Sequence, residues 1–158
     1  MKVVDYSNKK KIRELIKGKK VVLVGGCFDI LHFGHIKFLN AAKKLGNFLV
    51  VALESDEFIL NRKNKTPFHN LKERSFILSS ISYVDLIIKL PLFKKDSDYY
   101  DLVSFIKPNT IAVTGNDPYY EDKKKQAEMN NAQIKIVCSD INKFSSTKAL
   151  TYAPFSRD

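Results

Sequence analysis

Short apolar runs punctuate this chain at intervals of about thirty residues. Five of them stand out as nearly continuous stretches of aliphatic side chains, at residues 21–24, 48–53, 84–90, 110–113 and 134–138. A strand that is buried on both faces has no polar side to alternate with, so runs of this length are typical of parallel strands inside a sheet. The pattern therefore predicts five buried strands.

Segments with helical spacing separate these runs. Ile36, Leu39 and Ala42 recur at the spacing of one helix face, and the same spacing is seen over residues 71–81, 99–106 and 119–130. Strands that alternate with helices form βαβ units. We therefore predict an α/β fold, a Rossmann-like doubly wound five-stranded parallel sheet with helices on both faces. Ligands of such sheets bind beyond the carboxyl ends of the strands.

The whole chain, residues 1–158, is predicted to be a single domain. Residues 1–18 are expected to form an N-terminal helical extension that begins at Ser7 as N-cap and ends at Gly18. Residues 152–158 show no periodicity and are expected to be a tail. We found no internal repeat, no apolar run near the ~20 residues that span a bilayer, and no secretory signal, which predicts a cytoplasmic protein without membrane contact.

The charge balance favours anionic partners. The chain has 27 Lys and Arg against 17 Asp and Glu, a net charge of +10. Zinc-finger spacing and RNA-binding aromatic signatures are absent, so a nucleic-acid partner is a minority hypothesis. Two cysteines, Cys27 and Cys138, are too few for a disulfide framework. We interpret Cys27 as a small packed residue, with a catalytic thiol as the alternative.

The most informative segment follows the first strand. Gly25 and Gly26 precede His32-Phe-Gly34-His35, where the first crossover helix is expected to begin. Backbone N–H groups and the helix dipole make such a position an anion site. Glycines let the backbone approach a ligand closely, and two imidazoles one helical turn apart are able to donate hydrogen bonds to the same phosphates. Packing or capping histidines are the alternative.

Residues 24–39, VGGCFDILHFGHIKFL, resemble the signature of the cytidylyltransferase-like nucleotidyltransferases, and the similarity extends more thinly over residues 19–150. The resemblance implies that a substrate phosphate attacks the α-phosphorus of a nucleoside triphosphate, with Mg²⁺ assistance and pyrophosphate release. It assigns phosphate stabilisation to His32 and His35 and nucleotide contact to the loop that contains Cys27 and Phe28. Asp29 would support this loop or the metal, or act only as a turn residue; no metal ligand is identified.

Three basic residues match family positions in the next part of the chain. The resemblance assigns Lys65, and Lys63 with it, to the triphosphate and the substrate phosphate. Alone, this run would be interpreted as a solvated loop. Arg74 follows at the family's spacing and would clamp a phosphate of the nucleotide, or form a surface ion pair instead.

Two later segments of the chain also match positions of this family. Ser145, Ser146 and Thr147 follow the fifth run, where the family holds the triphosphate at a helix N-terminus; an ordinary N-cap is the alternative. Gly115 and Asp117 follow the fourth run and are predicted to line the nucleotide pocket, and they are equally suited to a turn and helix cap.

The base and the acceptor are less well defined. Glycerol-3-phosphate cytidylyltransferases carry Arg-Thr-X-Gly-Ile-Ser where this chain has residues 140–145, DINKFS, whereas residues 17–32 look more like heptose-1-phosphate adenylyltransferases. We therefore favour adenylyl transfer from ATP to a sugar phosphate, with cytidylyl transfer from CTP to glycerol 3-phosphate or a similar polyol phosphate as the alternative. A non-catalytic nucleotide-binding module is the alternative from another class. The resemblance also implies a possible homodimer.

Overall fold

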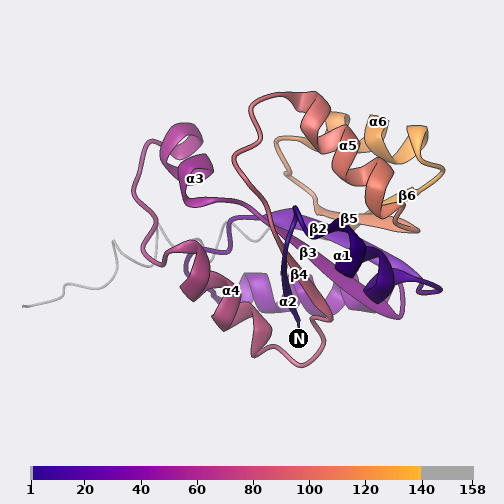
Figure 1. The fold of residues 1–158 in the computed structure, drawn as a ribbon, viewed down its shortest axis with the longest axis horizontal. Helices are drawn as coiled ribbons and strands as arrows, with labels where there is room; N and C mark the ends of the chain where they lie inside the picture. The colour runs from indigo at the N-terminus through magenta and orange to yellow at the C-terminus, as the bar shows by residue number, and fades with distance from the viewer. Residues whose placement is uncertain (1, 140–158) are drawn as a thin grey trace, which may run out of the picture.

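A single parallel sheet forms the centre of the molecule in the computed structural model, which describes residues 2–139 (Figure 1). Its strands are β1 (Val3–Asp5), β2 (Val21–Gly26), β3 (Phe48–Leu53), β4 (Leu86–Lys89), β5 (Thr110–Thr114) and β6 (Gln133–Cys138). The helices are α1 (Lys9–Ile16), α2 (Phe33–Lys43), α3 (Asp56–Lys63), α4 (Leu71–Ser79), α5 (Asp96–Ile106) and α6 (Tyr120–Met129). The predicted doubly wound α/β architecture is confirmed.

The strand order is β1-β4-β3-β2-β5-β6, with every pair parallel. The order reverses between β2 and β5, because β3 continues from β2 on one side and β5 begins the other side. Crossovers on the two sides of such a point leave a crevice at the carboxyl ends of the strands. The fold thus places a ligand site where β2 ends.

The predicted number of strands is wrong, since the sheet has six. The additional strand β1 pairs with β4 through Val3↔Ile87, and it lies at the sheet edge. A three-residue edge strand has no apolar run long enough to be recognised, so the N-terminal segment was interpreted as helical only. Its helix is present, but Asn8 rather than Ser7 is the N-cap, with its side chain accepting from the Lys11 N–H.

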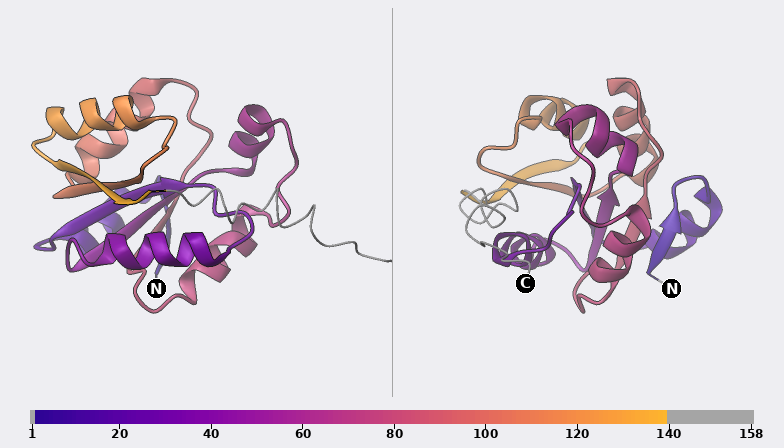
Figure 2. Two further views of the ribbon diagram at one scale, coloured as in Figure 1. Left: turned by 180° about the vertical axis from the view of Figure 1, so that it is seen from behind. Right: turned by 90° about the vertical axis from the view of Figure 1, so that its left-hand side faces the viewer.

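Each face of the sheet has its own apolar core. Helices α1, α5 and α6 cover one face, where Ile12, Leu102 and Ala127 pack against the strands. Helices α2 and α4 cover the other, with Leu39 and Leu78 in its core. Figure 2 shows the two helical layers on either side of the sheet. In the described part of the chain, no helix is long and apolar enough to cross a membrane.

Helix α3 is an element that the sequence did not predict. It lies between β3 and α4 and stands apart from the two helical layers in Figure 1. Ser55 caps its N-terminus by accepting from the Phe58 N–H, and Asn64 ends it in the left-handed conformation at φ 49°. The segment predicted as a basic loop is therefore the last turn of a helix and the loop that follows.

Candidate active site

A cavity of about 690 Å³ opens at the carboxyl ends of the strands, at the point where the strand order reverses. Loops after β2, β3, β4 and β5 contribute to its wall, together with α2, α3, α5 and α6. Of the residues singled out from the sequence, those that line it are Gly25, Gly26, Cys27, Phe28, Asp29, His32, His35, Lys63, Lys65 and Asp117. Residues from distant parts of the chain thus meet in one cavity.

The two histidines lie together at the start of α2. His32 is the N-cap residue, but its side chain makes no capping hydrogen bond. The ring of His35, one turn later, stacks on that of His32 with centroids 3.8 Å apart and planes tilted by 28°. The buried Nδ1 atom of His32 has no hydrogen-bond partner among the described residues. Packing or capping alone does not account for this pair, which faces the cavity.

Both rings are uncharged at neutral pH. Burial, followed by the nearby His32 and Lys63, lowers the pKa of His35 to about 4, and the Ile30 backbone acts in the opposite direction. Burial also lowers the pKa of His32. A neutral imidazole still donates one N–H, and an approaching anion favours its protonated form. The pair is therefore suited to bind phosphate oxygens and to gain charge when they arrive.

The loop between β2 and α2 requires a glycine at position 26. Phe28 has a positive φ of 46°, and its ring is buried at 5% exposure. A Cβ atom on Gly26 would lie 2.9 Å from the Phe28 ring, closer than real Cβ contacts. The Phe28 ring in turn packs against His35, with centroids 5.2 Å apart. Gly26 thus lets Phe28 support the second histidine.

Basic side chains line the cavity from α3 and the loop after it. Arg62, Lys63 and Lys65 are all part of its wall, and none of the three forms an ion pair with a described carboxylate within 4.0 Å. The left-handed Asn64 reverses the chain between the two lysines. Cationic groups that share a cavity with a histidine pair and lack a carboxylate partner favour the binding of an anion such as phosphate.

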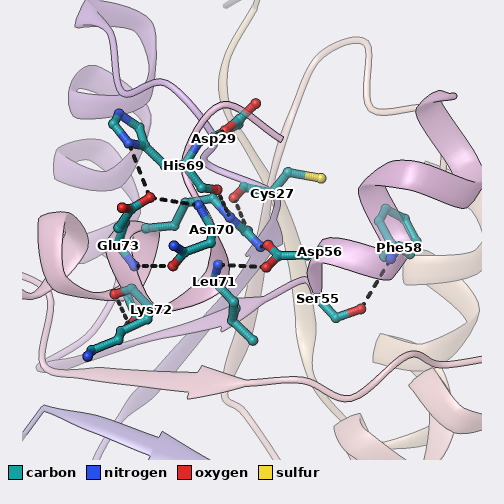
Figure 3. A network of polar contacts seen from close by, with 12 residues as sticks. Cys27, Asp29, Ser55, Asp56, Phe58, His69, Asn70, Leu71, Lys72 and Glu73 are labelled. Carbon is teal, nitrogen blue, oxygen red and sulfur yellow. Dashed lines mark hydrogen bonds and ion pairs between the residues drawn. The ribbon is translucent and has the colours of Figure 1, made fainter. Parts of the chain in front are cut away.

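Asp29 holds the loop that follows these lysines. Its two carboxylate oxygens accept hydrogen bonds from the Phe68 and His69 N–H groups, at 3.1 and 3.0 Å. Figure 3 shows Asp29 and His69 side by side. Of the alternatives for Asp29, loop support is the one that these two hydrogen bonds show. No group of three or more potential metal ligands occurs among the described residues.

Arg74 does not line the cavity. Its side chain is fully buried, and it donates to the Cys27 carbonyl at 2.6 Å, to the His69 carbonyl at 3.1 Å and to Asp56 Oδ1 at 2.6 Å. Figure 3 shows this network around Asp56 and Asn70. All three guanidinium nitrogens thus have protein acceptors, so in this structure Arg74 fixes the cavity wall rather than facing a ligand.

Other predicted residues fall into three groups. Gly34 is buried in the first turn of α2 and is not part of the cavity wall. Gly115 is not part of it either. It lies against the end of β6, where its N–H donates to the Cys138 carbonyl at 2.9 Å and a Cβ would lie 2.6 Å from the carbonyl oxygen of Ser139, the residue after the strand. Asp117 lines the cavity and pairs with Lys123 at 2.6 Å. Ser145, Ser146, Thr147 and the predicted tail lie outside the described residues.

The sequence did not indicate several cavity residues. Glu54, Tyr99 and Lys123 are among the polar ones. Glu54 comes directly after β3, and the rule that ligands bind at the carboxyl ends of strands would have identified it. Tyr99 and Lys123 lie on amphipathic helices whose polar positions give no such signal.

The comparison with known proteins identifies the class of this chain. Residues 23–156 match the family model described as cytidylyltransferase-like. The chain belongs to the cytidylyltransferase-like family, as the motif around His32 and His35 predicted.

The relatives that the chain resembles are larger proteins. It is 40% identical over 129 residues to the bifunctional protein HldE of Campylobacter jejuni serotype O:2. The aligned residues cover 77% of this chain and 26% of the relative. It is 36% identical over 134 residues to the bifunctional protein HldE of Sulfurimonas denitrificans, covering 84% and 26%. The match thus spans about a quarter of the length of these curated relatives.

Solved structures show the same fold. A lipopolysaccharide core biosynthesis protein from Thermoplasma volcanium superposes with a TM-score of 0.62 at 30% identity, covering 78% of this chain and 98% of the other. A pantoate-beta-alanine ligase from Francisella tularensis has a TM-score of 0.69 at 18% identity, covering 98% and 74%, and shows likeness of fold alone.

Proposed function

We propose that this protein transfers the adenylyl group of ATP to a sugar phosphate, with heptose 1-phosphate as acceptor, and releases pyrophosphate. The observation that carries this proposal is the convergence of His32, His35, Lys63 and Lys65 on one cavity at the carboxyl end of β2. Hydrogen-bond donors and cations gathered there suit a chain of phosphates.

The relatives support the choice of acceptor. HldE is named a bifunctional protein, and residues 17–32 of the present chain resemble heptose-1-phosphate adenylyltransferases. The present chain matches about a quarter of HldE, and the matching family model is that of a nucleotidyltransferase. We infer that it corresponds to the adenylyltransferase part.

The reaction is a displacement at the α-phosphorus. An oxygen of the acceptor phosphate forms a bond to this phosphorus, and the bond from it to the oxygen that bridges to the β-phosphate breaks. The electron pair leaves with pyrophosphate. His32 and His35 donate hydrogen bonds to the phosphates, and Lys63 and Lys65 offset the negative charge that accumulates as the bond breaks. Catalysis of this kind depends on positioning and charge neutralisation.

Mg²⁺ is proposed to arrive on the phosphates of the nucleotide. Asp29 is committed to two backbone N–H groups, and the described residues hold no cluster of three metal ligands. Mg²⁺ needs no such cluster, since it commonly keeps its waters and binds through substrate phosphates. When bound it would add positive charge there, and no step assigned to the residues above depends on a protein-bound ion.

Pyrophosphate release from a matrix of substrates tests this proposal. ATP, CTP, GTP and UTP would each be incubated with heptose 1-phosphate and with glycerol 3-phosphate. We expect the largest turnover with ATP and heptose 1-phosphate. Faster turnover of CTP with glycerol 3-phosphate would overturn the proposed substrates. Nucleotide binding without turnover of any acceptor would indicate a non-catalytic module.

A further inference from the structure

A second polar group lies in the same cavity, on the side of α5. Glu54 follows the last residue of β3, and its backbone N–H donates to the Gly26 carbonyl at 3.1 Å. Its side chain therefore starts next to the strand end that leads to the histidines. Glu54 is only 7% exposed, yet it lines the cavity.

The carboxyl group of Glu54 has one partner and lacks another. Oε1 accepts a hydrogen bond from the Tyr99 hydroxyl at 3.0 Å. Oε2 is buried and has no hydrogen-bond partner among the described residues. A buried polar atom without a partner costs free energy, so such atoms in native proteins call for an explanation. A ligand group in the cavity provides one.

The position of the Tyr99 hydroxyl is fixed by aromatic packing. The Tyr99 ring meets Phe93 edge to face, with centroids 5.0 Å apart, and Phe93 meets Tyr6 in the same way at 5.4 Å. Rings held in this manner have little rotational freedom. Glu54 and Tyr99 thus form a preorganised pair rather than a flexible surface contact.

The surroundings of this pair indicate what it binds. Leu90, Leu102 and Val103 line the cavity, and Arg62 and Lys123 also act electrostatically on Glu54. Lys123 is already paired with Asp117 at 2.6 Å. The carboxyl group of Glu54 disfavours a phosphate beside it, and the histidines with Lys63 and Lys65 provide the phosphate-binding groups instead. A metal ion is also disfavoured, because no cluster of three potential ligands occurs in residues 2–139. A neutral hydroxyl group, which donates to Oε2, satisfies the pair.

We propose that Glu54 and Tyr99 form the subsite that binds hydroxyl groups of the acceptor, so that the enzyme selects a polyhydroxylated phosphate over a plain alkyl phosphate. Glu54 Oε2 accepts a hydrogen bond from one acceptor hydroxyl, and the Tyr99 oxygen is placed to accept a second. This inference rests on the proposed nucleotidyl transfer to a sugar phosphate and names the residues that would recognise the sugar.

The test compares two acceptors that share a phosphate group. Heptose 1-phosphate offers hydroxyl groups, and methyl phosphate offers none. With ATP as donor at pH 8 or above, where a pKa of about 7 leaves Glu54 ionised, Glu54→Leu is expected to raise the KM for heptose 1-phosphate by about 10- to 100-fold, the range for a lost hydrogen bond to a charged group. The KM for ATP and kcat/KM for methyl phosphate should change less than threefold. Tyr99→Phe should also raise the KM for heptose 1-phosphate.

Two further variants act as controls. Glu54→Gln keeps the shape and one acceptor oxygen, so it should recover part of the loss seen in Glu54→Leu. Glu57→Leu makes the same change at an exposed carboxylate of α3 that does not line the main cavity, and it should leave both acceptors unaffected. Thermal unfolding of each variant shows whether the fold is retained.

The outcomes separate this inference from the proposed function. Turnover of heptose 1-phosphate with an unchanged KM in folded Glu54→Leu would overturn the hydroxyl subsite and leave nucleotidyl transfer standing. Equal losses for heptose 1-phosphate and methyl phosphate would also overturn it, because the residue would then act on the phosphates. No pyrophosphate with any acceptor would defeat the proposed function, and the inference with it.

Discussion

The histidines of the cavity achieve phosphate recognition without a permanent charge. Burial lowers the pKa of both His32 and His35, and the neighbouring His32 and Lys63 lower that of His35 further, so the rings favour the neutral form in the absence of a ligand. Two adjacent imidazolium ions would repel each other and destabilise the empty cavity. A pair that becomes protonated only beside phosphates avoids this cost and still supplies charge where it is needed.

Replacing His35 removes one of these donors. We expect His35→Ala to lower the rate of pyrophosphate release by about 10²- to 10³-fold, the usual effect of losing one donor to a developing negative charge. ATP should still stabilise the variant against thermal unfolding, because Lys63 and Lys65 remain. Turnover within a few-fold of the wild type would contradict the assigned role.

His35 also predicts how stability depends on pH. Its pKa falls from 6.5 in the unfolded chain to about 4 in the fold, so the unfolded state binds more protons between these values. The contribution of neutral His35 to the free energy of unfolding is complete above pH 6.5 and is lost as the pH falls towards 4. Urea unfolding at several pH values measures how the free energy of unfolding depends on pH.

His35→Gln is the matched variant for that experiment, since glutamine does not titrate. The free energy of unfolding of the wild type should fall relative to the variant as the pH is lowered through this window. Glu54 acts in the opposite direction, because its pKa rises from 4.5 to about 7 and its contribution is lost as the pH rises towards 7. If the free energies of unfolding of the wild type and His35→Gln changed in parallel with pH, the pKa assigned to His35 would be contradicted.

At the scale of elements, one arginine joins three segments. Arg74 on α4 binds Asp56 at the start of α3 and the carbonyl of Cys27 in the loop after β2. The carboxyl group of Asp56 also accepts from the Leu71 N–H at 3.0 Å. The helix that ends at Lys63 is thereby fixed to the loop that leads to the histidines.

Arg74→Met tests this connection. The change leaves the partly buried carbonyl groups of Cys27 and His69 without their donor and breaks an ion pair whose arginine is fully buried. We expect the free energy of unfolding to fall by about 1.5–3 kcal/mol, the range for lost hydrogen bonds of a charged group, because the Asp56 side chain is 37% exposed and remains hydrated. Lys72→Met, an exposed position on the same helix, should change it by less than about 0.5 kcal/mol. Urea unfolding compares the two variants, and a loss under 1 kcal/mol in Arg74→Met would be inconsistent with the joining role.

The elements also show where the sequence was informative. Long apolar strands such as Phe48–Leu53 and the helix that begins after His32 were predictable, because burial on both faces and helical spacing leave strong periodic signals. Strand β1 and helix α3 were not, since the first is short and the second has an irregular, mostly polar face. The role of Arg74 depends on three contacts from distant segments, which no local pattern encodes.

Across the whole molecule, charge is distributed unevenly over one cavity. Arg62, Lys63 and Lys65 line it from α3 and the following loop, whereas Glu54 lies near α5. This arrangement would orient a phosphorylated acceptor with its phosphate towards the histidines and its hydroxyl groups towards the carboxylate. A single cavity with two chemically different parts is consistent with a reaction between two substrates.

Removing divalent cations should stop the reaction without unfolding the protein. If Mg²⁺ enters on the nucleotide, EDTA should abolish pyrophosphate release, and added Mg²⁺ should restore it fully. The thermal midpoint of the protein without nucleotide should not change with EDTA, because the described residues hold no cluster for a structural metal. A midpoint lowered by EDTA would instead indicate a metal bound by the protein.

The central claim is that the bond broken lies at the α-phosphorus. ATP labelled in the α-phosphate and ATP labelled in the γ-phosphate would be incubated separately with the protein and heptose 1-phosphate. We predict that the α-label moves to the sugar phosphate and that the γ-label appears in pyrophosphate. Transfer of the γ-label to the acceptor, or retention of the α-label in ATP, ADP or AMP alone, would contradict nucleotidyl transfer.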